Sequence, residues 1–228
     1  MLGQLKLEEG GWGNARAEDL YGLSVLRTCA DPKGYLGGFR LTRAGKKLQT
    51  AGVRRVLLPP HFEDSDLLKR FHLRPVDPGP FVRSQSAELA LQALKCRGMD
   101  LKRATVALRG SRTDRDMAQA ARILCPVVRH IIVEAPRGGE ELAKELRWEF
   151  GIPVLPPEEM GEIALRFDSE AHVQEPALEL YGLHPDLGGL RICGQDMREE
   201  DREDLQVLTA LWERGKMPPE RLNIIYDT

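Results

Sequence analysis

Residues 104–118 read ATVALRGSRTDRDMA, and this stretch decides the class of fold that we expect. A short apolar run over residues 104–108 ends at Arg109-Gly110, and a run with helical periodicity begins near Asp114. In α/β proteins, a turn between a strand and a helix often holds a phosphate, because free N–H groups and the helix dipole favour an anion there. The stretch therefore predicts a strand, a turn and a helix, and raises the question of whether the turn binds a ligand.

The same alternation continues on both sides of this stretch. We expect strands at residues 53–58, 73–76, 130–133 and 152–155, and helices at residues 64–72, 86–97, 114–124, 140–150 and 157–167. Strands that alternate with helices of about 10–15 residues indicate βαβ units and a mostly parallel sheet. The sequence therefore predicts an α/β protein whose sheet has flanking helices.

The two ends of the chain are less regular. Residues 20–27 favour a strand and residues 42–50 a helix. After an irregular stretch we expect a strand at 190–193, a helix at 200–214 and a last strand at 222–226. We divide the chain into a smaller N-terminal α/β portion (1–99), a core (100–167) and a C-terminal strand-helix-strand extension that packs on the core (168–228).

Composition excludes several classes of protein. The 228 residues are 42% hydrophobic and 30% charged, with a net charge of −2, so no strong basic field would attract nucleic acid. No apolar stretch approaches the roughly 18–20 residues of a membrane span, and the N-terminus lacks an apolar signal core. We therefore expect a cytoplasmic protein without nucleic-acid or membrane partners. The four widely spaced cysteines predict reduced thiols rather than a zinc site or a disulfide framework.

Three turns gather where a ligand would bind, because parallel sheets bind ligands at the carboxyl ends of their strands. They are residues 109–115, 134–139 and 156–158. The first two precede helix N-termini, and arginines and hydroxyls could add to the attraction for an anion. The alternative is that Ser, Thr and Asp are ordinary N-caps and that Gly-Gly is an ordinary turn. The candidate binding residues are Gly110, Ser111, Arg112, Thr113, Arg115, Glu134, Arg137, Gly138 and Gly139.

Residues 86–155 resemble the entry into the nucleotide-binding domain of two-domain dehydrogenases. In those families a helix with an AxxAL-like pattern precedes the first strand of the Rossmann unit, and residues 87–94 and 104–110 are similar to these two elements. Glu134 ends the next strand, 24 residues after Gly110, near the place where the family's acidic residue binds a ribose hydroxyl. The resemblance implies a Rossmann-like core over residues 100–167, with NAD(P) or another nucleotide as ligand.

The turn departs from the family's G-x-G-x-x-G fingerprint. Only Gly110 is present; Arg112 and Arg115 stand where the second and third glycines would be. The second glycine lets the backbone approach the pyrophosphate, and the third allows close helix packing. The departure indicates a degenerate Rossmann domain whose cofactor is lost or changed.

A second resemblance uses the same turn. Residues 111–113, Ser-Arg-Thr, are similar to the Asn-Arg-Thr motif of shikimate dehydrogenases, which follows the second strand and contacts the 2′-phosphate of NADP. A glycine-rich turn should then follow residues 53–58, where the sequence has Pro59-Pro60-His61-Phe62 instead.

Other constellations carry weaker chemistry. His61, Glu63, Asp64 and Asp66 could hold a divalent metal, or His61 could act as a general acid or base, but the carboxylates also suit the capped start of a helix. Cys125 ends a helix, where the dipole raises a thiol pKa rather than lowering it. Neither a G-x-S-x-G elbow nor a P-loop occurs in the sequence.

Two hypotheses of function remain. The first is a protein that binds a phosphate-bearing small molecule or nucleotide at the carboxyl edge of its strands, as in a divergent NAD(P)-dependent oxidoreductase. The second is a non-catalytic interaction or regulatory protein on a degenerate dehydrogenase fold, acting through a protein partner or a homo-oligomer. We assign no catalytic residue, because the lysine–aspartate pair of such dehydrogenases is not evident.

Overall fold

The computed structural model of the protein describes residues 1–60, 62, 64–171 and 173–226. The chain forms two compact units. Unit 1 comprises Met1–Asp77 and Asp204–Pro218, and unit 2 comprises Pro78–Glu203 and Pro219–Thr228. The chain thus forms most of unit 1, then most of unit 2, returns to unit 1 and ends in unit 2. The boundaries between these units lie at other residues than the boundaries of the three consecutive segments expected from the sequence.

Unit 1 contains a mixed five-stranded sheet with the order β2-β3-β1-β4-β5. β2 pairs with β3 antiparallel, and the other neighbours are parallel. The strands are β1 (Leu2–Leu7), β2 (Trp12–Leu20), β3 (Leu23–Ala30), β4 (Arg55–Leu57) and β5 (Arg74–Pro75). The prediction of a single N-terminal strand at 20–27 is therefore incomplete, since three strands precede the first helix.

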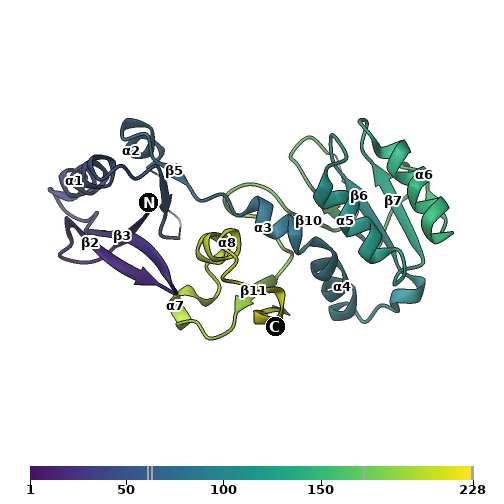
Figure 1. The fold of residues 1–228 in the computed structure, drawn as a ribbon. Helices are drawn as coiled ribbons and strands as arrows, with labels where there is room; N and C mark the ends of the chain where they lie inside the picture. Colours follow the sequence, from purple (N-terminus) through teal and green to yellow (C-terminus); the bar gives the residue numbers. More distant parts are fainter. Residues whose placement is uncertain (61, 63, 172, 227–228) are drawn as a thin grey trace. The chain divides into compact units, whose positions relative to one another are not determined.

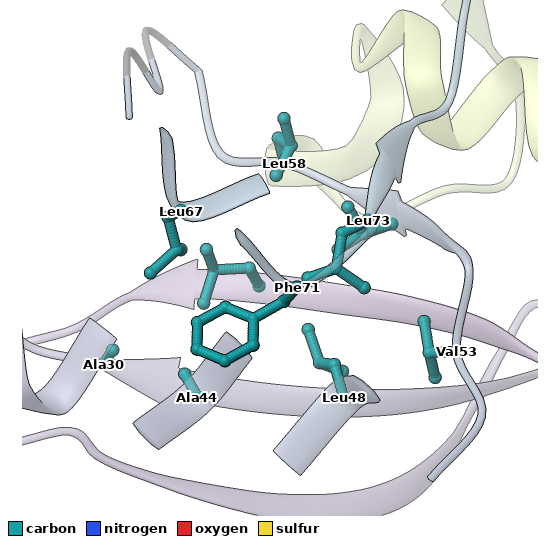
Figure 2. Close-up of a cluster of buried hydrophobic side chains, with 10 residues drawn as sticks. Ala30, Ala44, Leu48, Val53, Leu58, Leu67, Phe71 and Leu73 are labelled. Atoms are coloured by element: carbon teal, nitrogen blue, oxygen red, sulfur yellow. The ribbon is translucent and has the colours of Figure 1, made fainter. Parts of the chain in front are cut away.

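Helices α1 (Gly37–Thr50) and α2 (Ser65–Arg70) pack on this sheet and close a hydrophobic core. Figure 2 shows the ring of Phe71 lying among Ala44, Leu48 and Leu67. Helix α8 (Leu205–Glu213), near the C-terminus, also belongs to unit 1. The buried N–H of Leu58 donates to Gln206 Oε1 at 3.0 Å, and Arg55 forms a bidentate ion pair with Glu213.

Unit 2 contains a five-stranded parallel sheet with the order β10-β9-β6-β7-β8. Figure 1 shows β6 and β7 of this sheet side by side. The strands are β6 (Thr105–Arg109), β7 (His130–Glu134), β8 (Val154–Leu155), β9 (Ile163–Arg166) and β10 (Ala177–Glu179). Counted from β6, the order is 3-2-1-4-5, the strand order of a Rossmann fold over its first five strands. The direction of winding reverses between β6 and β9, so the switch point lies at the carboxyl ends of these two strands. The predicted Rossmann-like α/β fold is confirmed.

Helices α4 (Ser86–Cys96), α5 (Arg115–Leu124) and α6 (Gly139–Phe150) pack in a row, α4 on α5 and α5 on α6. All five residues of β6 are buried. The Asp114 side chain caps α5 by accepting from the Met117 N–H. Gly151 ends α6 with a φ of +65°, a conformation that favours glycine.

The predicted helix at residues 157–167 is wrong. This stretch instead contains a turn followed by β9, which pairs with β6 in parallel. A Cβ on Gly161 would lie 3.0 Å from the Thr105 carbonyl oxygen, and the Glu162 N–H donates to that oxygen at 2.9 Å. The side-chain cluster of Ala107, Ile132 and Ala164 is covered by Leu155, Val173 and Ala177 rather than by a crossover helix.

The predicted helix at 200–214 is two helices. Helix α7 (Glu199–Arg202) is followed by its C-cap, Glu203. Asp204 then caps the start of α8. Strands β11 (Leu190–Gly194) and β12 (Leu222–Tyr226) pair antiparallel, and β12 contacts α4 in unit 2. In the part of the chain that the structure describes, no helix has both the length and the apolar character that crossing a bilayer requires.

Candidate ligand site at the switch point of unit 2

A cavity of about 550 Å³ opens at the switch point. Its walls are the turns that follow β6, β7 and β9, together with Arg83 of helix α3 (Gly79–Ser84). Ser111 and Arg112 come from the first turn, Arg137 from the second and Asp168 from the third. Open α/β sheets bind ligands at this position.

The first two turns are joined by hydrogen bonds. The Gly110 N–H donates to the Glu134 carbonyl at 2.9 Å, and the Thr113 N–H donates to the Arg137 carbonyl at 2.8 Å. Arg112 and Arg137 form an isolated parallel bridge. The bridge places two exposed arginines next to each other at the cavity.

Asp168 occupies the first turn from the opposite side of the switch point. Its Oδ2 accepts the Ser111 N–H at 2.7 Å and the Ser111 Oγ hydroxyl at 2.8 Å, and its Oδ1 accepts the Glu170 N–H at 3.0 Å. Desolvation favours the neutral acid, but the hydrogen bonds from Ser111, together with those from the Glu170 and Ala171 N–H groups, outweigh it and hold the pKa of Asp168 below its ordinary value. The carboxylate is therefore charged at neutral pH.

Arg109, the last residue of β6, is only 5% exposed. It pairs with Glu134, and its Nε donates to Glu175 Oε1 at 2.7 Å. Its Nη1 and Nη2 also donate to the carbonyls of Pro157 and Glu159, each at 3.0 Å. This network joins the β8–β9 connection and the segment before β10 to the centre of the sheet.

The predicted binding residues fall into three groups. Ser111, Arg112 and Arg137 line the cavity. Gly110 and Thr113 hold the turns together, and Glu134 is engaged by Arg109. The remaining three lie at helix starts: Arg115 is exposed on α5, Gly138 is the left-handed N-cap of α6, and Gly139 is its first residue.

The sequence reasoning missed Asp168 and Arg109 as site residues. Asp168 comes two residues after the end of β9, a strand that the sequence pattern predicted as the end of a helix. Had residues 163–166, Ile-Ala-Leu-Arg, been taken as a buried strand, Asp168 would have appeared at the carboxyl edge with the other turns. Arg109 carried no signal of its own, because its carboxylate partner Glu175 is 66 residues away.

The other candidate residues named from the sequence are the acidic cluster after the 53–58 strand and Cys125. His61 and Glu63 of the proposed metal cluster lie outside the described residues. Among the residues that the structure does describe, no group of three His, Cys, Asp or Glu side chains could hold a metal ion. Cys125 is buried, and burial together with the nearby Glu149 raises the pKa of its thiol to about 11.

No protein-family model matches the chain, and no curated protein matches it in sequence. Solved structures with similar folds include L-tryptophan dehydrogenase from Nostoc punctiforme, 17% identical over 72% of this chain and 55% of its own, with a TM-score of 0.32. The chain thus spans little more than half the length of that enzyme.

Two shikimate dehydrogenases are also similar in structure. The Listeria monocytogenes enzyme, solved with shikimate and NAD, is 9% identical over 72% of this chain and 67% of its own, with a TM-score of 0.27. The Thermus thermophilus enzyme, solved with NADP(H) and shikimate, is 20% identical over 77% of this chain and 74% of its own, also with a TM-score of 0.27. The chain resembles these structures only weakly, and the Rossmann-like character of unit 2 rests on its own strand order.

Proposed function

We propose that unit 2 binds a phosphate-bearing small molecule in the switch-point cavity, with the phosphate held between Arg112 and Arg137. Mononucleotides are among the candidate ligands. One observation carries this proposal: the bridge between the two turns brings both arginines to the same cavity. Guanidinium groups bind phosphate oxygens through paired, charge-assisted hydrogen bonds, so two adjacent arginines suit a phosphate.

The start of α6 supports the same assignment. Gly138 is its N-cap and has no side chain to cap the first turn, where the Gly139 N–H donates to the Ala135 carbonyl. The N-terminus of a twelve-residue helix adds a positive dipole next to Arg137. Arg137 and the helix dipole therefore favour negative charge at this place, and Glu140 and Glu141 in the first turn offset part of that attraction.

The nicotinamide dinucleotide that the fold implies fits this cavity poorly. The Ser111 N–H, which lies where a Rossmann turn would face a pyrophosphate, already donates to Asp168. We therefore route no redox step through a dinucleotide and assign no catalytic residue.

Binding is tested by thermal shift and calorimetry with AMP, ATP, NAD, NADP and inorganic phosphate, with sulfate as the anion control. A ligand at about 100 times its Kd should stabilise unit 2 by roughly 2.7 kcal/mol. Replacing both Arg112 and Arg137 by Ala should weaken the binding of a phosphate ester by roughly one to two orders of magnitude, since both charge-assisted contacts are lost.

The matched control is the double variant Arg103→Ala/Arg129→Ala. Both residues are exposed, lie near the amino ends of β6 and β7, and remove the same charge. The control should bind as the unaltered protein does. Equal affinity in the Arg112/Arg137 variant and the unaltered protein would overturn the proposed site.

The occupied first turn supports a second candidate function. A Rossmann-like unit whose own carboxylate fills the cofactor turn suits a non-catalytic interaction protein. If none of these compounds shifts the unfolding temperature, this second function is favoured, and a partner should be sought by cross-linking to unit 2.

A further inference from the structure

We infer that Asp168 takes the place of a pyrophosphate at the first turn and restricts the cavity to ligands with a single phosphate group. The ligand class is then phosphomonoesters, such as mononucleotides or sugar phosphates, and not dinucleotides. This inference rests on the proposed function and sharpens it, because it assigns the specificity to one residue.

The geometry of the first turn is that of an occupied anion site. In a dinucleotide-binding turn, backbone N–H groups at the helix start face the pyrophosphate, and glycine allows the close approach. Here Asp168 Oδ2 accepts both donors of Ser111, at 2.7 and 2.8 Å. A Cβ on Gly110 would lie 3.3 Å from the same oxygen, so the carboxylate packs directly over this glycine. The space that a pyrophosphate needs is filled by the chain itself.

Asp168 is also held firmly in this position. The Glu170 N–H donates to its second oxygen at 3.0 Å, so the turn after β9 fixes the carboxylate against the turn after β6. A pyrophosphate would have to displace a charged carboxylate from its hydrogen bonds and then lie beside it. Like charges in a partly desolvated cavity repel, so both steps oppose a dinucleotide.

The second turn is left open to one phosphate. Arg112 stands where a dinucleotide-binding turn has its second glycine, and its bridge to Arg137 brings a second guanidinium group to the wall of the same cavity. The cavity thus has a fixed anion, Asp168, held against Ser111, and two arginines, Arg112 from the first turn and Arg137 from the second. A ligand with one phosphate and neutral polar groups matches this arrangement of charges, and a dinucleotide does not.

The test compares AMP and NAD as probes by calorimetry on the full chain and on two variants, Asp168→Ala and Asp168→Asn. NAD is chosen because it carries a pyrophosphate and no phosphomonoester. The unaltered protein should bind AMP at least roughly tenfold more tightly than NAD. Asp168→Ala removes both the charge and the bulk and should raise NAD affinity by roughly tenfold or more, with AMP affinity changed less than threefold. Asp168→Asn keeps an acceptor for Ser111 and loses only the charge, so it should show a smaller gain.

A matched control is Asp186→Ala. Asp186 is an exposed aspartate that likewise accepts a backbone N–H, that of Gly188 at 2.9 Å, but it does not line the cavity. This variant should leave the preference for AMP unchanged. Circular dichroism establishes whether each variant is folded, and if Asp168→Ala is not, the Asn variant carries the test.

The outcomes separate the two proposals. NAD binding to the unaltered protein as tightly as AMP, or no gain in NAD affinity in either Asp168 variant while AMP still binds, overturns the role of Asp168. Failure of AMP to bind the unaltered protein, together with NAD binding to Asp168→Ala, overturns the phosphomonoester function and supports Asp168 as the group that closes the first turn. Absence of binding in all variants overturns both.

Discussion

Arg109 is the residue on which the irregular parts of unit 2 depend. Its planar guanidinium donates to two carboxylates and to two backbone carbonyls of the β8–β9 connection. Burial opposes its charge, but the hydrogen bonds and charges of Glu134 and Glu175 more than compensate and raise its pKa. Lysine could not replace it, because an ammonium group lacks the fixed fork of donors that reaches four acceptors.

We expect Arg109→Met to destabilise unit 2 by about 3 kcal/mol, because it leaves Glu175 buried without its partner and two carbonyls without donors. The double variant Arg109→Met/Glu175→Leu should recover roughly half of this loss, since apolar replacement of a whole buried pair costs little. Urea unfolding followed by circular dichroism measures both. If the double variant is no more stable than Arg109→Met, the buried pair is not the cause.

The pH dependence of the stability of Arg109→Met tests whether loss of the ion pair with Glu175 causes the destabilisation. Desolvation raises the pKa of Glu175, but the hydrogen bond from its own backbone N–H and the hydrogen bond and charge of Arg109 more than offset this and hold the pKa below its ordinary value. A depressed pKa in the folded state means that the stabilisation is complete at neutral pH and is lost as the pH falls below about 4. The stability difference between Arg109→Met and the unaltered protein should therefore shrink below that pH, and a difference that grows instead would contradict the assignment.

At the scale of elements, the segment between β8 and β9 is what makes unit 2 differ from a regular doubly wound α/β fold. A helix usually covers this crossover, whereas here residues 156–162 pass close along β6. Gly161 makes this approach feasible, because its Cα faces the backbone of Thr105 and Ala107 at distances that leave no room for a Cβ.

Gly161→Ala should destabilise unit 2 by about 1–3 kcal/mol, since an added Cβ would lie 3.0–3.1 Å from backbone atoms that cannot move independently. Gly38→Ala is the comparison: there an added Cβ meets open space in α1, and the change should be neutral or stabilising by up to about 1 kcal/mol. Thermal unfolding of the two variants decides the point. Equal effects at both positions would show that close approach at Gly161 is unimportant.

The elements that could be predicted from the sequence are those with their own apolar period and caps. The α5 and α6 helices begin and end within one residue of their expected bounds. β2 could not be predicted, because most of its side chains are exposed or half-buried, so it lacks an apolar pattern. β9 could not be separated from a helix, because a short run that is buried on both faces carries no period.

The candidate site divides in the same way. Ser111, Arg112 and Arg137 follow from the rule that turns after parallel strands gather at one edge, which needs only local sequence. Asp168 and Ser111 are 57 residues apart in the sequence. Their contact depends on the strand order of the sheet, which local sequence patterns do not predict. The residue that we propose to set specificity was therefore the one that required the structure.

At the scale of the whole molecule, the return of the chain makes unit 1 depend on residues from the far end of the sequence. Helix α8 places Val207, Leu208 and Leu211 in the interior, each at most 1% exposed, and its Gln206 accepts a buried N–H from Leu58. A boundary drawn along the sequence would assign this helix to the preceding residues of unit 2. The contacts assign it to the unit that begins at Met1.

Leu208→Ala should therefore destabilise unit 1 by about 3 kcal/mol, since it opens a cavity in a closed core. Hydrogen exchange should then show lost protection in β1, β3 and β4 while β6 and β7 keep theirs, because compact units open separately. Leu146→Ala, at a fully buried position of α6 in unit 2, should give the opposite pattern. Loss of protection in β6 and β7 on changing Leu208 would mean that α8 stabilises unit 2, and the division of the chain would have to be redrawn.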